Sequence, residues 1–220
     1  AQFTINDKDS ADQYARLYAD NIVHTINDLN LPRYGLGNYI APSPDKPPTQ
    51  AEARQLADLS RAGKRLKGFC RTNLFKRLES SGQAFLQSIE RHVLRNYVYL
   101  HAIEEGRELP VGTLDAGSLD ARIYDEDADA PTADLRMFDD DDTAGVGPGE
   151  TNNLRTEADF KRRAAEVYAE YTTKYKSRFK WLRPSLFDVS LIEHLESDSQ
   201  ALLTILQKSG HWNPAKDTKL

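Results

Sequence analysis

The chain is 220 residues long, 39% hydrophobic and 29% charged, with a formal net charge of −5 at pH 7. This length can bury one substantial core, so we expect a single domain with at most a small attachment. No apolar run approaches the roughly 20 residues that a membrane-spanning helix needs, and the first residues do not resemble a signal peptide. The single cysteine, Cys70, excludes an internal disulfide and a zinc site built from cysteines, and predicts a reducing, cytoplasmic compartment.

The acidic side chains are concentrated in one tract, residues 115–150. This tract holds twelve acidic and two basic side chains, a net charge of −10. The remaining residues therefore hold 27 basic and 22 acidic side chains, a net charge of +5. Few residues between 112 and 153 could anchor a core, so we expect a disordered segment or a loosely held surface loop there. The rest of the chain is mildly basic.

Apolar residues at three- and four-residue spacing predict a first helix over 10–30, and Pro32 with the Gly35 turn ends it. Four prolines in the next segment, residues 41–48, exclude regular structure there.

Thr49 followed three residues later by Glu52 forms a capping box, which predicts that the second helix begins at this point. We expect this helix to run to about residue 62 and to break at Gly63. A long third helix is predicted over 70–105, because its apolar residues form a stripe broad enough to pack against more than one partner.

A second long helix is predicted from Thr156 to 182, and Pro184 breaks it. A last helix is predicted over 186–208, with Ser185 and Asp188 forming its N-terminal cap. No segment alternates with period two, so no β-strand is predicted. Together these elements predict an all-α domain across 1–214, with four to six helices, two of them long, and the acidic insertion at 115–150.

Seven basic residues and no acidic ones lie between positions 61 and 77, a stretch that we call the basic segment. Like charges at this density repel one another unless a polyanion neutralises them. We therefore expect the seven side chains to face outward and contact the phosphates of a nucleic acid. The other interpretation is a solvated face that pairs with acidic neighbours, including the 115–150 tract. The seven candidate residues are Arg61, Lys64, Arg65, Lys67, Arg71, Lys76 and Arg77.

No residues form a recognisable active site or metal site in this sequence. Pairs of histidine and glutamate occur on predicted helices, but none has the Glu-x-x-His spacing of a di-iron bundle, so we expect surface residues. The aromatic row at 168–179 has helical spacing and is expected in the core rather than stacked on bases. The histidine and glutamate residues concerned are Glu90, His92, His101, Glu104, Glu193 and His194.

The sequence Arg-Thr-Asn-Leu-Phe-Lys-Arg-Leu-Glu-Ser-Ser at 71–81, followed by Ala84 and Phe85, resembles a signature of bacterial Swi/Snf-like helicases of superfamily two. In that family the signature lies on the helical segment between the two RecA-like motor lobes. Residues 31–34 and 180–183 are similar to flanking parts of the same segment, and 210–220 resembles the approach to the second lobe. The resemblance covers most of the chain outside the acidic tract.

The resemblance implies that this chain is a piece of a larger ATP-dependent DNA translocase, with the following lobe beginning at 215–220. ATP and Mg²⁺ would then bind to the motor lobes, because the phosphate-binding and metal-binding motifs of the family are absent here. These residues would have no catalytic group, cofactor or metal of their own. Their partners would be the backbone of duplex DNA and the RecA-like lobes of the same chain, with no membrane involved. Helices 70–105 and 156–182 would transmit lobe movement.

Two other hypotheses remain open from the sequence. The basic segment could dock an acidic protein partner, or the chain's own 115–150 tract, in a protein-interaction module that binds no DNA. A stand-alone enzyme of unknown type is the weakest hypothesis, because no catalytic constellation supports it.

Overall fold

The computed structural model describes Tyr14, Leu17 and residues 20–112 and 154–210. The acidic tract at 115–150 and the predicted lobe start at 215–220 lie outside these residues. The described part is mainly helical, which confirms the predicted all-α class. None of its helices has both the length and the apolar composition needed to cross a membrane.

The helices are α2 (Asp20–Asp28), α3 (Gln50–Ser80), α4 (Gly82–Glu104), α6 (Glu157–Thr173) and α7 (Ser190–Ser209), with short 3-10 helices η1 (Leu36–Tyr39), η3 (Lys176–Arg178) and η4 (Pro184–Leu186).

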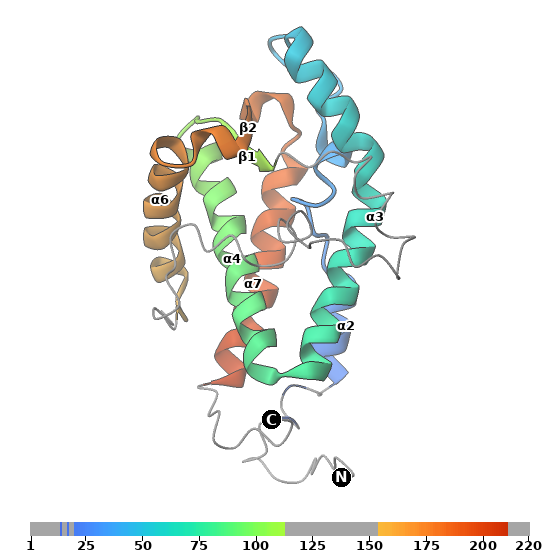
Figure 1. Ribbon diagram of the computed structural model, residues 1–220, viewed down its shortest axis with the longest axis vertical. Coiled ribbons are helices and arrows are strands. Elements are labelled where there is room, and N and C mark those ends of the chain that lie inside the picture. Colours follow the sequence, from blue (N-terminus) through green and yellow to red (C-terminus); the bar gives the residue numbers. More distant parts are fainter. Residues whose placement is uncertain (1–13, 15–16, 18–19, 113–153, 211–220) are drawn as a thin grey trace, which may run out of the picture.

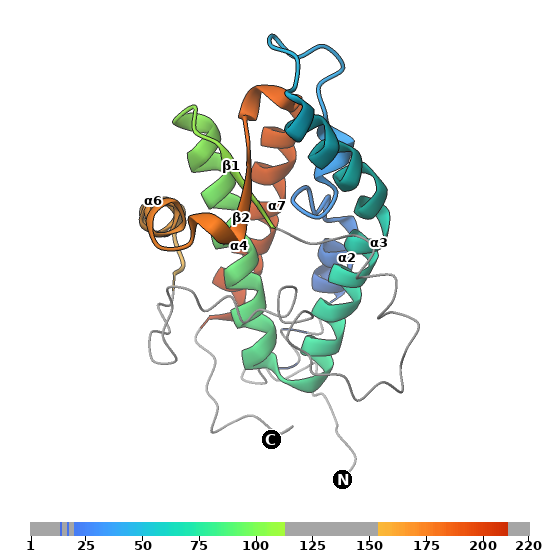
Figure 2. The ribbon, with the colours of Figure 1, turned by 45° about the horizontal axis from the view of Figure 1, so that its top comes forward.

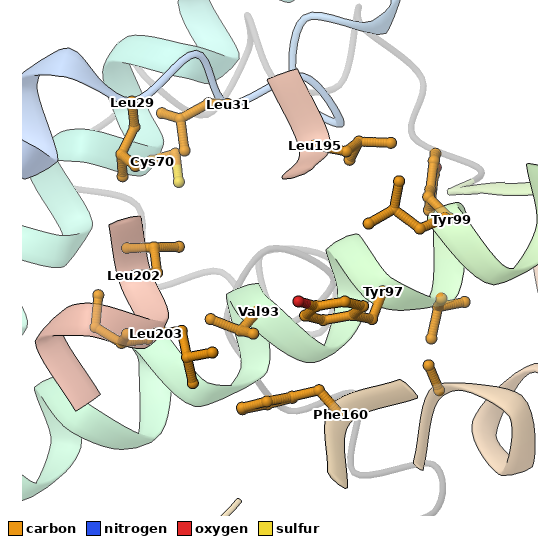
Figure 3. Close-up of a cluster of buried hydrophobic side chains, with 14 of the residues drawn as sticks. Leu29, Leu31, Cys70, Val93, Tyr97, Tyr99, Phe160, Leu195, Leu202 and Leu203 are labelled. Carbon is orange, nitrogen blue, oxygen red and sulfur yellow. The ribbon is translucent and has the colours of Figure 1, made fainter. Parts of the chain in front are cut away.

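Helix α4 lies at the centre of the fold and packs against α7, α6 and α3 (Figure 1). Its apolar residues Phe85, Ile89 and Val93 are completely buried, as the broad stripe predicts. Figure 3 shows the ring of Tyr97 beside that of Phe160 from α6, and the two rings are stacked with centroids 5.9 Å apart. Each buried side chain of this size contributes roughly 1.5–3 kcal/mol relative to an exposed one, so α4 organises the core.

The capping box at Thr49 and Glu52 is present, and it confirms the predicted start of α3. The predicted break at Gly63 is wrong, because α3 continues for 31 residues to Ser80. Gly63 instead allows close packing: a Cβ there would lie 3.3 Å from the Cα of Gly35. The glycine therefore lets the segment before η1 approach the helix.

The predicted continuous helix over 70–105 is also wrong, because Ser81 separates α3 from α4. Ser81 has an extended backbone, and its hydroxyl accepts a hydrogen bond from the Ala84 amide at 3.3 Å. The next residue, Gly82, is buried and donates its amide to the Tyr14 hydroxyl at 3.4 Å. The two helices therefore form a hairpin, in which both can pack against the same core (Figure 2).

Two short strands, β1 (Leu109–Gly112) and β2 (Phe179–Leu182), pair antiparallel with Leu109 opposite Leu182. The prediction of no strand is therefore wrong, and the helix predicted to reach residue 182 ends at Thr173. Each strand has only four residues, too few for a clear alternation, and their pairing joins segments far apart in the sequence.

Helix α7 begins at Ser190, later than predicted, because Ser185 lies in η4. Asp188 accepts a hydrogen bond from the Ser190 amide at 2.9 Å, so the predicted cap between Ser185 and Asp188 is wrong. Gly210 follows the last turn with a positive φ of 63°, a conformation that glycine adopts without strain.

Candidate nucleic-acid interface

All seven residues of the basic segment lie on α3, but they do not all lie on one side of the helix. With about 100° per residue, positions 61, 64, 65 and 76 fall within about 120° of one another around the axis. Arg61 and Lys76 are exposed, as are Gly68 and Thr72 between them. The structure does not describe the side chains of Lys64 and Arg65, but their positions on α3 belong to this side. We call positions 61, 64, 65 and 76 the outer basic face.

The outer basic face has one described carboxylate partner within its own helix. Arg61 lies 3.9 Å from Asp58, and the two side chains are 75% and 55% exposed. An exposed pair at this distance is weak and screened by water and salt. Asp58 therefore leaves most of the Arg61 charge available to a ligand.

Lys67 and Arg71 do not belong to the outer basic face, so the prediction that all seven side chains face outward is wrong for this inner pair. Both are half-buried. The Arg71 guanidinium donates to the carbonyl oxygen of Leu29 at 2.5 Å, and the Lys67 ammonium lies 5.7 Å from the centre of the Tyr39 ring. Lys67 is about 60° around the axis from the buried Cys70, on the side toward the core. Arg71 is about 20° from position 64, so its contact with Leu29, rather than its angle on the helix, sets it apart.

Arg77, the last member of the basic segment, lies half-buried in the final turn of α3. Its position is about 160° from that of Arg61 around the helix axis. Around the helix axis, Lys67 and Arg77 are therefore separated from the four positions of the outer basic face, and Arg71 is set apart by its contact with the Leu29 carbonyl.

Asp198 of α7 is a buried carboxylate that the sequence analysis missed. It is 2% exposed and accepts hydrogen bonds from the amides of Asn30 at 2.9 Å and Leu31 at 2.7 Å. Burial nevertheless raises the pKa of Asp198, and the hydrogen bonds oppose that shift. Asp198 occupies the apolar side of α7, between the buried Leu195 and Leu202. A single carboxylate on the otherwise apolar side of a predicted helix was the signal that could have identified Asp198.

Asp198 and Arg71 together fix the turn that follows α2. Leu31 has a positive φ of 48°, which is a strained conformation for a residue with a branched side chain. Arg71 binds the carbonyl oxygen of Leu29, while Asp198 binds the next two amides, those of Asn30 and Leu31. Two charged side chains from separate helices therefore hold three consecutive residues of the turn.

An ion pair between Glu52 and Arg183 fixes the N-terminal end of α3. The Arg183 Nε donates to one Glu52 oxygen at 2.8 Å, and its Nη2 donates to the other at 3.0 Å. The hydrogen bond from Arg183 lowers the pKa of Glu52 to about 2, despite the opposing effect of burial. This bidentate contact joins the start of α3 to the end of β2.

His92 is buried, and Glu90 is half-buried beside Arg155, so the prediction that both are surface residues is wrong. The Nε2 of His92 lies 3.6 Å from the sulfur of Cys70, a pairing that the sequence did not indicate. Its Nδ1 lies 3.3 Å from Nη2 of Arg33. A guanidinium can only donate, so Nδ1 is the acceptor and the Nε2 proton faces the sulfur.

Within 20–112 and 154–210, no three histidine, cysteine, aspartate or glutamate side chains form a group that could hold a metal ion. The aromatic row is in the core, as predicted. Tyr168 and Tyr171 are buried, while Tyr175 and Phe179 pack against the core cluster.

Comparisons with family models, curated proteins and solved structures found no match to this chain. The resemblance to Swi/Snf-like helicases therefore stays a prediction based on the sequence.

Proposed function

We propose that this chain is a non-catalytic helical domain of a cytoplasmic, Swi/Snf-like DNA translocase. In this proposal it contacts the nucleic-acid backbone through the outer basic face and couples the two motor lobes of the larger protein. The lobes would supply ATP binding, Mg²⁺ binding and hydrolysis. The observation that carries the proposal is that four basic positions share one side of a single helix, in a segment without carboxylates.

The dimensions of α3 suit a phosphate backbone. From Arg61 to Lys76 the helix rises about 22 Å at 1.5 Å per residue. One strand of B-DNA has a phosphate about every 3.4 Å along its axis, so this length runs past about six phosphates. Four cations spread over that distance could contact several phosphates without reading the base sequence.

The attachment of α3 to the domain supports a role in coupling. Its first turn is held by the pair between Glu52 and Arg183, and its middle is held through Arg71. Its last turn leads through Ser81 into α4, which packs on α6 and α7. A force applied to the outer basic face would therefore reach the core through several contacts rather than through a flexible linker. In this proposal α3 and α4, the two helices of the hairpin, transmit the movement in place of the single helix predicted over 70–105.

A salt series measures how many cations contact phosphate. Binding of this chain to a labelled DNA duplex would be followed by fluorescence anisotropy. Four phosphate contacts give a slope of about −3.6 for log affinity against log salt, whereas seven contacts give about −6.3. We expect the smaller slope. A flat response would contradict DNA binding, and the larger slope would contradict the division of the basic segment.

Charge reversal with a matched control tests the location of the contact. The test variant carries R61E, K64E, R65E and K76E, and we expect it to lose most of its DNA affinity. The control reverses four exposed lysines elsewhere: K46E, K174E, K180E and K208E. Equal losses in the two variants would show that net charge alone matters and would sink the assignment to α3.

Deletion of residues 115–150 separates DNA binding from the alternative of an interaction module. If the acidic tract covers the outer basic face, the deletion raises DNA affinity. If the basic segment docks only an acidic protein, DNA binding is absent both with and without the tract.

A further inference from the structure

Helix α3 contains two glycines in its interior, and their surroundings are opposite. Only proline is less favourable than glycine inside a helix, so neither residue is there to form the helix. Gly63 is buried, and a Cβ there would lie 3.3 Å from the Cα of Gly35. Gly68 is exposed, and among the described residues a Cβ there would meet no atom within 4 Å, apart from its chain neighbours and the nearby backbone of its own helix. Packing inside the protein therefore explains Gly63 but not Gly68.

Gly68 lies at the centre of the outer basic face. Along α3 it is near the midpoint between Arg61 and Lys76, about 10.5 Å from the first and about 12 Å from the second at 1.5 Å per residue. Around the axis, position 68 falls between those of Lys64 and Arg65, about 40° from the one and about 60° from the other. The one residue of α3 without a side chain that internal packing does not explain is thus surrounded by the positions of the four cations.

The next residue on this side of α3 also keeps the surface low. Thr72 lies one turn beyond Gly68 and about 40° around the axis. It is exposed, and its hydroxyl donates to the Gly68 carbonyl oxygen at 3.1 Å, so this side chain is folded back on the helix. The exposed long side chains of Arg61 and Lys76 lie about two turns away on either side. A ligand can therefore come closest to the helix backbone at the centre of the face.

We propose that Gly68 is the point of closest approach between α3 and the nucleic-acid backbone, and that its missing side chain lets phosphates reach the cations on both sides of it. This inference rests on the proposed function. The attraction between a cation and a phosphate falls as their separation grows, so a side chain at position 68 holds the backbone away from the whole outer basic face. A phosphate backbone suits this arrangement, because its charges continue along its length and meet the cations on each side of the centre.

The test adds an uncharged side chain at position 68. G68A and G68Q would be titrated with a labelled DNA duplex by fluorescence anisotropy at several salt concentrations, with G112A and G112Q as matched controls. Gly112 is also exposed, and among the described residues a Cβ there would likewise meet nothing within 4 Å, but it lies at the end of β1.

The expected loss of affinity follows from the salt dependence of a phosphate contact. At 0.1 M salt one contact is worth about eightfold in affinity. We expect G68Q to bind about eightfold more weakly than the wild type, with a salt slope smaller in magnitude by about 0.9. G68A should lose less, because its side chain is shorter. Both Gly112 variants should bind as the wild type does.

Thermal unfolding gives a readout that moves in the opposite direction. Alanine and glutamine form helices better than glycine, so both Gly68 variants should melt about 2–4 °C above the wild type. A loss of DNA affinity in a variant that is more stable than the wild type cannot come from unfolding.

The outcomes separate this inference from the proposed function. If the wild type binds the duplex and the Gly68 variants bind it equally well, the role of Gly68 is overturned and the proposed function stands. Equal losses in the Gly68 and Gly112 variants would likewise overturn only the role of Gly68. A wild type that does not bind DNA would overturn both.

Discussion

The outer basic face and the inner pair belong to the same helix, and yet they have different surroundings. Arg61 and Lys76 are exposed to solvent, whereas Arg71 contacts the turn after α2 and Lys67 lies beside the Tyr39 ring. Cations in the first group are available to a ligand outside the molecule, while those in the second group contact the protein itself. A run of basic residues in a sequence is therefore not a count of basic residues on a surface.

The largest expected effect is on stability, from Asp198→Ala. This change leaves the amides of Asn30 and Leu31 without their acceptor in the interior, and the free energy of unfolding should fall by about 3 kcal/mol. Urea denaturation followed by circular dichroism measures it. Asp198→Asn should lower the free energy of unfolding by less, because the amide keeps one acceptor oxygen and removes a carboxyl group whose pKa is raised by burial. A D198A variant as stable as the wild type would show that this carboxylate does not hold the turn.

The second effect compares the same substitution on the two sides of α3. Arg71→Gln removes a charged donor from the Leu29 carbonyl and should lower the free energy of unfolding by about 1.5–3 kcal/mol. Arg61→Gln removes an exposed, weakly paired group and should change it by less than about 0.5 kcal/mol. Both values come from the same denaturation experiment, and equal values would contradict the division into two sides.

The reverse order is expected for DNA binding. Arg61→Gln should reduce the magnitude of the salt slope by about 0.9, the contribution of one phosphate contact. Arg71→Gln should leave the slope unchanged under conditions in which the variant is folded. Anisotropy titrations at several salt concentrations measure both, and a reduced slope in R71Q would place Arg71 in the interface.

The smallest effect concerns the attachment of α3 at its first turn. The pKa of Glu52 is lowered from 4.5 to about 2, so its charged form is favoured by folding. The resulting stabilisation is complete above pH 4.5 and is lost as the pH falls towards 2. Glu52→Gln should therefore lower the melting temperature at pH 7 and have little effect near pH 2. Because Arg183 is partly exposed to water, we expect a modest difference in melting temperature between Glu52→Gln and the wild type. A difference that is independent of pH would contradict the role of the Glu52 charge.

Local signals in the sequence were sufficient where the interaction is itself local. The Thr49 and Glu52 capping box lies within one turn, and the structure has it as predicted. The apolar stripe of α4 and the aromatic row at 168–179 follow from helical spacing, and both lie in the core. The prolines at 41–48 excluded helix, and no helix forms there.

Local signals did not predict the helix ends correctly where a distant contact determines whether the helix stops. Gly63 predicts a helix break, but its missing side chain allows the close approach of Gly35 instead. Ser81 gave no strong sign of a helix end, although the hairpin turns at this residue. The strand pair at 109–112 and 179–182 was equally hidden, because neither strand is long enough to show a pattern alone.

The sequence by itself determined the helical class, the apolar faces of the helices and the position of the positive charge along the chain. These features follow from periodicity and composition, which act over a few residues. Only the tertiary structure decided which of the cations face water, because that depends on how α3 is rotated against the turn at 29–39 and against α7. A rotation of this kind is set by contacts such as that of Arg71 with the Leu29 carbonyl, which joins residues 42 positions apart.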